Sequence, residues 1–140
     1  METSDLQRHQ TIKRLTTQPT DKVADAAIFL WEQMAIHIIA IVGDGGFNAL
    51  YARSLFLTKP HHPWLTGRAQ AVQTGSWLEE LKNDFEGKTP AQIREANALL
   101  LKTFTDILVS LIGEPLTTRI LNSAWSDIAQ DGITKEFKNE

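Results

Sequence analysis

The chain has 140 residues, which suits one domain that is long enough to bury a core. Hydrophobic residues make up 42% and charged residues 22%, and this ordinary balance excludes disordered and fibrous classes. A net charge of -3 without a basic run argues against a nucleic-acid partner, since phosphate binding normally needs a basic patch. The absence of cysteine excludes disulfides, thiolate metal sites and cysteine nucleophiles.

The N-terminal residues 1–19 are polar throughout, so they do not have the apolar stretch of a signal peptide. Ser4 with Gln7 three residues later has the spacing of a capping box and predicts a short helix to about Thr16. Its apolar positions are few: Leu6, Ile12 and Leu15. We therefore expect an arm or short helix that is either mobile or docked on the outside of the domain.

A helical domain is predicted over residues 20–131, and its first helix is the most apolar part of the chain. Thr20 or Asp21 is expected to cap this helix. Apolar residues then cover almost its whole circumference, which indicates a helix surrounded by others. Residues 26–42 could be read as a membrane span, but they number only 17 and include charged Glu32. We therefore expect a buried central helix in a soluble, cytoplasmic protein without a membrane partner.

Gly43 is expected to end this helix, and Asp44 to cap the next. The second helix should bury one face, formed by Phe47, Leu50, Tyr51, Ser54 and Leu55. Pro60 ends it, and the proline-stiffened loop that follows should close one end of the domain with Trp64 and Leu65. Residues 66–74 show little pattern.

A short helix is predicted to open at Ser76 and to close at Gly87. The strongest start signal in the chain follows, with Thr89 as cap, a proline at the first turn and Gln92 to complete a capping box. This long helix should bury a core side made of Ile93, Ala96, Leu100, Phe104, Ile107, Leu108 and Leu111. Gly113 should end it, and the last helix should run to Asp131–Gly132, leaving residues 132–140 as a polar tail.

One corner of the chain occurs twice. The segment Ile38–Asp44 recurs 70 residues later as Leu108–Glu114, and the same offset places Leu50 on Ile120. Two explanations stay open: an ancient duplication, or convergence of two helix–glycine–helix corners on similar residues. Both predict an all-α, single-domain helical bundle built from two helix–glycine–helix hairpins. It should have about four principal helices plus short peripheral ones, and no sheet.

No set of residues predicts a reaction. His37 is a candidate ligand or metal contact, but a core histidine bonded to a backbone carbonyl is favoured. The glycine-rich residues 43–46 favour a tight helix corner over a phosphate-binding loop, since they lack the P-loop lysine. The pair His61-His62 has no carboxylate at ligand spacing. We predict no catalytic residues, no metal site and no cofactor.

The sequence favours a non-enzymatic helical interaction or regulatory module that forms a homodimer or binds a protein partner. A surplus of apolar and aromatic helix surface, including four tryptophans, supports this hypothesis. The alternative is a small-ligand sensor with a pocket between the helical hairpins, formed near His37, Tyr51 and Arg53. An enzyme is a third hypothesis, for which the sequence offers no convergent titratable pair.

Overall fold

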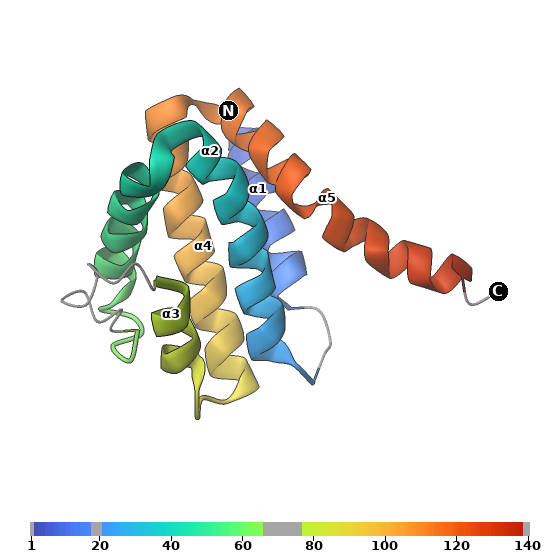
Figure 1. Ribbon diagram of the computed structural model, residues 1–140, viewed down its shortest axis with the longest axis horizontal. Helices are drawn as coiled ribbons and strands as arrows, with labels where there is room; N and C mark the ends of the chain where they lie inside the picture. The colour runs from blue at the N-terminus through green and yellow to red at the C-terminus, as the bar shows by residue number, and fades with distance from the viewer. Residues whose placement is uncertain (1, 18–20, 66–76, 139–140) are drawn as a thin grey trace.

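The computed structural model describes residues 2–17, 21–65 and 77–138. These residues form five helices and no strand, which confirms the predicted all-α fold. The helices are α1 (Glu2–Thr16), α2 (Val23–Thr58), α3 (Trp77–Phe85), α4 (Pro90–Ile112) and α5 (Glu114–Lys138). Helix α4 lies at the centre, where it packs against α1, α2 and α5 (Figure 1).

The chain turns back at two glycines. Gly43 has φ 82° and ψ 167°, so it interrupts α2, and residues 44–58 turn back down the molecule, with α4 between them and the first half of α2 in this view (Figure 1). Gly113 has φ 92° and ψ 160° and separates α4 from α5. This backbone region is open to glycine because it has no Cβ. The two corners predicted from the sequence therefore share one backbone conformation.

The equivalence of the two segments extends to their packing. Residues 31–40 and residues 101–110 show the same order of buried, half-buried and exposed positions, residue for residue. Trp31 and its equivalent Leu101 are both fully buried, as are Ile38 and Leu108. In these segments, residues that lie 70 positions apart therefore have equivalent burial in the fold as well as similar side chains.

The core is centred on the ring of Trp31. Its edge meets the rings of Tyr51, Trp77 and Phe104, with centroids 5.4, 6.1 and 5.3 Å away. The indole N–H of Trp31 donates to Asn97 Oδ1 at 2.7 Å, and both side chains are buried. A buried indole normally needs such a partner, so this bond joins α2 to α4 at the middle of the bundle.

The structure confirms some of the predicted helix ends and corrects others. The capping box at Thr89 and Gln92 is confirmed, with both reciprocal hydrogen bonds present. The prediction for α2 is wrong at Asp21, because the N-cap is Lys22 and it makes no side-chain capping bond, while Thr20 lies outside the described residues. Helix α5 also continues past Asp131–Gly132 to Lys138 and extends away from the bundle (Figure 1). A glycine inside a helix costs only about 1 kcal/mol, which does not have to end it.

The N-terminal helix is docked on the bundle. Ile12 and Leu15 of α1 are buried, and α1 packs against α4. The loop after α2 has Leu65 fully buried, while Trp64 meets the ring of Phe85 at 6.1 Å, in line with its predicted role of closing one end. The weakly patterned residues 66–74 and Ser76 lie outside the described residues.

Helix α2 is less buried than the sequence predicts. Phe29 is 45% exposed and Ile36 is 62% exposed, so one side of the helix is uncovered by the described residues. Within the described residues, α2 is also the one helix that is long and apolar enough to cross a membrane, although only 39% of its most apolar window is buried. The prediction of a surrounded helix is wrong because apolar residues lie on an inner and an outer face.

Leu111 is another exception, since it was predicted on the core side of α4 but is 64% exposed. It occupies the last turn before Gly113, where the chain turns from α4 into α5. Ile41, its equivalent before Gly43, is also exposed. Both corners therefore present an apolar side chain at the same end of the bundle.

Candidate functional site

The three residues predicted to line a ligand pocket do not converge. His37 is half-buried, and its Nδ1 lies 3.0 Å from the carbonyl oxygen of Gln33, to which it can donate. That carbonyl belongs to the preceding turn of the same helix. The contact agrees with the favoured interpretation of His37 as a histidine satisfied by a backbone carbonyl.

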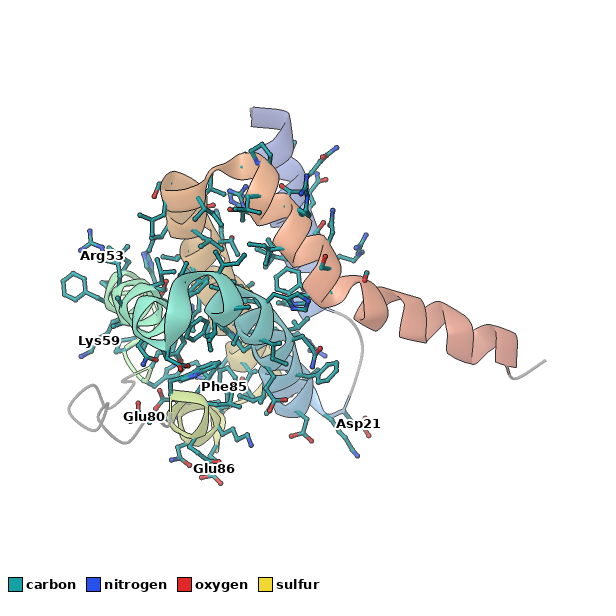
Figure 2. The ribbon with its side chains drawn as sticks, turned by 45° about the horizontal axis from the view of Figure 1, so that its top comes forward. Asp21, Arg53, Lys59, Glu80, Phe85 and Glu86 are labelled. Atoms are coloured by element: carbon teal, nitrogen blue, oxygen red, sulfur yellow. The ribbon has the colours of Figure 1, made fainter. Side chains whose placement is uncertain are left out.

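Tyr51 and Arg53 lie on different sides of the second half of α2. Tyr51 is buried among aromatic rings, and burial raises the pKa of its phenol, with smaller contributions from the charges of Asp84 and Glu80. Arg53 is exposed and points away from the bundle (Figure 2). Residues two apart on a helix do not share a face, so these two side chains cannot bind one ligand together.

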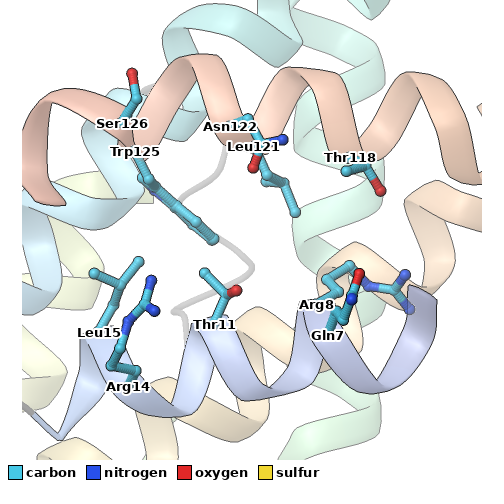
Figure 3. A pocket seen from close by; sticks show the side chains of 10 residues that line it. All are labelled: Gln7, Arg8, Thr11, Arg14, Leu15, Thr118, Leu121, Asn122, Trp125 and Ser126. Carbon is cyan, nitrogen blue, oxygen red and sulfur yellow. The ribbon is translucent and has the colours of Figure 1, made fainter. Parts of the chain in front are cut away.

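A groove between α1 and α5 is lined by both polar and apolar side chains. Its volume is about 340 Å³, within the range of small-molecule pockets (Figure 3). Both helices pack against α4, and the groove runs between them. Its lining consists of Gln7, Arg8, Thr11, Arg14, Leu15, Thr118, Leu121, Asn122, Trp125 and Ser126.

One end of this groove is closed by an ion cluster. The guanidinium of Arg8 donates from Nη2 to Asp106 Oδ1 at 2.6 Å and from Nη1 to Glu114 Oε2 at 3.3 Å. The ring Nε2 of His9 lies 2.9 Å from the same Asp106 oxygen. The cluster ties α1 to α4 and to the start of α5, and its carboxylates offset the charge of Arg8.

The other end of the groove is different, because Arg14 is exposed and makes no hydrogen bond or ion pair with a described residue. The lining contains no acidic residue. Leu15, Leu121 and Trp125 form the apolar floor of the groove, and all three side chains are buried. The groove therefore combines an apolar floor with a positive charge that no described carboxylate offsets.

The outer face of α2, which we define as Phe29, Glu32, Gln33, Ile36 and Ile39, is a second candidate site. A hollow of about 480 Å³ lies on this face and is lined also by Ala35 and Trp77. It is apolar apart from the side chains of Glu32 and Gln33.

The equivalent face of α4 lies beside α1 but is only partly covered by it. Adding 70 residues to Phe29, Glu32 and Ile36 gives three positions on α4: Leu99, Lys102 and Asp106. Leu99 and Lys102 line a gap against α1, and Asp106 pairs with Arg8 of α1. Helix α1 thus contacts this face of α4, although Lys102 and Asp106 are exposed like their equivalents Glu32 and Ile36.

Comparison with protein-family models, with curated proteins and with solved structures finds no match to this chain. The described residues also contain no group of three or more His, Asp or Glu side chains placed to hold a metal ion. The candidate sites therefore have to be judged on their own geometry.

The groove between α1 and α5 was missed by sequence reasoning. Its signal is present, since Arg8, Ile12 and Leu15 are spaced by four and three residues and so share one face of a helix. That pattern marks a docking face with a charged end. It is hidden in the sequence because two aliphatic side chains in a polar segment look too few to anchor a helix.

Proposed function

We propose that the chain is a non-enzymatic helical interaction module that self-associates through the outer face of α2. The observation that carries this proposal is the exposure of Phe29 and Ile36, 45% and 62%, on a face whose equivalent on α4 is contacted by α1. Two large apolar side chains seven residues apart on a helix form a stripe of the kind that packs against another helix.

The proposed occupant is α2 of a second copy. On α4, positions 99, 102 and 106 accept α1, so a face built from equivalent positions has the width to accept a helix. The closed assemblies that proteins most often form are twofold dimers, in which the same patch meets itself.

The outer face of α2 is also self-complementary. If two copies pack antiparallel about a twofold axis between Glu32 and Gln33, Phe29 meets the partner's Ile36 and Ile36 meets the partner's Phe29. The same axis places the Gln33 amide where it can donate to the carboxylate of the partner's Glu32. The partner's Phe29 would then enter the hollow lined by Ile36, Ile39 and Trp77, in the manner of an aromatic anchor.

A lipid bilayer is the competing occupant, since α2 has the length and hydropathy of a membrane span. We favour a second copy because Asp25 and Glu32 are exposed on this side of α2. A carboxylate in hydrocarbon costs several kcal/mol, whereas at a protein interface it can be hydrogen-bonded.

Sedimentation velocity over a range of concentrations tests the proposal. The wild-type protein should sediment as a species of twice the 15.7 kDa chain mass. The variant Ile36→Asp, which gives α2 the residue found at the equivalent position 106, should sediment as a monomer with unchanged helical circular dichroism. Phe56→Asp is the matched control: Phe56 is 69% exposed on α2 beyond the corner, so this variant should remain a dimer.

A wild-type monomer at all concentrations would contradict the proposal, and so would equal effects of the two substitutions. Flotation with vesicles distinguishes the competing occupant. A monomeric wild type that floats with lipid, and an Ile36→Asp variant that does not, would assign the outer face of α2 to a bilayer instead.

A further inference from the structure

The groove between α1 and α5 has a chemistry that differs from the outer face of α2. Its floor is formed by Leu15 of α1 and by Leu121 and Trp125 of α5, and all three side chains are buried. In Figure 3 the side chains of Leu121 and Trp125 point into the groove from α5, and Thr11 points into it from α1. The volume of about 340 Å³ is sufficient for a small organic molecule.

The charges along the groove are unevenly balanced. At one end Arg8 is held by Asp106 and Glu114, so its charge is already paired. At the other end Arg14 lines the groove without a carboxylate partner among the described residues. A guanidinium prefers a carboxylate or another planar anion because it donates two parallel hydrogen bonds.

We infer that this groove binds a small amphipathic carboxylate, with its carboxylate on Arg14 and its apolar body over Leu15, Leu121 and Trp125. The two arginines are six residues apart on α1, which corresponds to about 9 Å along a helix. The apolar body therefore has to be short and to end before the ion cluster at Arg8. The inference is independent of self-association, since it uses α1 and α5 and none of the residues on the outer face of α2.

The polar residues of the groove fit this ligand class. Thr11 and Asn122 supply a hydroxyl and an amide group to the lining, and neither carries a charge. A cationic ligand would be repelled by Arg14, and a purely apolar ligand would gain nothing from that guanidinium. A carboxylate with a short apolar chain would pair with Arg14 and would also cover the apolar floor.

Octanoate, 1-octanol and acetate are probes that separate the two contributions. Isothermal titration calorimetry on the full chain should show octanoate binding more tightly than 1-octanol, which has the same chain without the charge. Acetate, which has the charge without the chain, should bind too weakly to measure. Equal affinities for octanoate and 1-octanol would contradict the role of Arg14.

Two neighbouring residues of α1 provide a matched pair of variants. Arg14 lines the groove against α5, whereas Lys13 lines the gap against α4. Arg14→Gln should weaken octanoate binding about tenfold, the loss expected for one charge-assisted contact, and should leave 1-octanol unchanged. Lys13→Gln removes the same net charge and should leave octanoate binding unchanged. Equal weakening by both variants would reduce the effect to net charge and would overturn the inference.

A third variant tests whether octanoate binds in the groove, independently of the charge of Arg14. Thr11→Phe puts a ring into the groove, so it should abolish octanoate binding while the helical circular dichroism and the sedimentation of the protein stay unchanged. Retained binding in this variant would show that octanoate binds elsewhere. If the variant changed the sedimentation of the protein but kept the wild-type affinity for octanoate, the groove would not be the octanoate site, whether or not the protein self-associates through α2.

Discussion

The half of the molecule around Gly43 and the half around Gly113 follow the same plan but have different surroundings. Their glycines share a backbone conformation, and residues 31–40 repeat the burial of residues 101–110. The inner faces are therefore equivalent. The outer faces differ, since α1 packs on α4 while Phe29 and Ile36 of α2 are exposed.

The residue types at equivalent positions of the two halves also differ on their outer faces. Asp106 of α4 is polar and pairs with Arg8 and His9 of α1, and the equivalent residue of α2 is the aliphatic Ile36. The face that α1 contacts thus has an ion pair at a partly exposed position, whereas the face without a described neighbour has an apolar residue there. A solvent-facing helix would normally show the opposite, which is why the contrast points to a partner on α2.

The largest effect is expected in the core, at a hydrogen bond between two buried side chains that breaks the equivalence of the halves. Trp31 and Asn97 are bonded, whereas their equivalents Leu101 and Ala27 are both apolar and buried. Trp31→Leu should lower the free energy of unfolding by about 3 kcal/mol, because ring contacts are lost and the Asn97 carbonyl is left unpaired. Urea unfolding followed by circular dichroism measures this loss.

The double variant Trp31→Leu with Asn97→Ala gives the first pair the residue types of the second. It should be more stable than the sum of the two single losses predicts, since no buried polar group is then left without its partner. The amide Nδ2 of Asn97 already lacks a partner among the described residues, which favours this recovery. Strictly additive losses would show that the hydrogen bond contributes little.

The core and the corners could be read from the sequence, and the surfaces could not. The turns at Gly43, Gly87 and Gly113 and the Thr89 capping box rest on local backbone chemistry, so spacing identifies them, although the same rule was wrong at Gly132. The identity of buried positions on α2 was harder, because Phe29 and Ile36 look the same whether they face a core or a partner. Sequence periodicity measures how apolar a face is, and it does not reveal what covers that face.

The candidate sites show the same limit. His37, Tyr51 and Arg53 were grouped by their nearness in the sequence, but the first bonds to its own helix, the second is buried and the third faces solvent. The α1–α5 groove joins residues more than 100 positions apart, such as Arg14 and Trp125. Only the docking of α1 brings them together, and two aliphatic residues in a polar segment gave little sign of it.

A smaller effect is expected at the corners. Ala in place of Gly43 or Gly113 should lower the free energy of unfolding by about 1–3 kcal/mol in each case, since positive φ with extended ψ is strained for any residue with a Cβ. Steric contact is not the cause, because a Cβ at Gly43 would meet no atom within 4 Å and at Gly113 only Pro115 Cδ at 3.9 Å.

Gly45 is the matched control for these variants. It lies in the helical part after the corner, and a Cβ there would also meet no atom within 4 Å. Gly45→Ala should therefore stabilise the protein by about 0.5–1 kcal/mol, the usual gain from replacing a helical glycine. If Gly43→Ala proved as harmless as Gly45→Ala, the two corners would not depend on the same backbone conformation.

The smallest effect at neutral pH is expected at Tyr51, whose equivalent in the other half is the non-titrating Leu121. Burial raises the pKa of Tyr51 above its usual value of about 10, and the charges of Asp84 and Glu80 add to the shift. Below that value the phenol is neutral in both states, so Tyr51→Phe should show the same pH dependence as the wild type. Above it the unfolded chain releases a proton that the folded chain keeps, and stability should fall by ~1.4 kcal/mol per pH unit relative to the Phe variant.

Tyr51 is the single tyrosine of the chain, so the absorbance of tyrosinate reports on this residue alone. In an alkaline titration the tyrosinate signal should rise together with the loss of helical circular dichroism, because ionisation requires the buried phenol to reach water. A tyrosinate signal that develops near the ordinary pKa while the helices stay intact would mean that the second half of α2 opens locally. The aromatic cluster would then be less rigid than the aliphatic packing at the equivalent position 121.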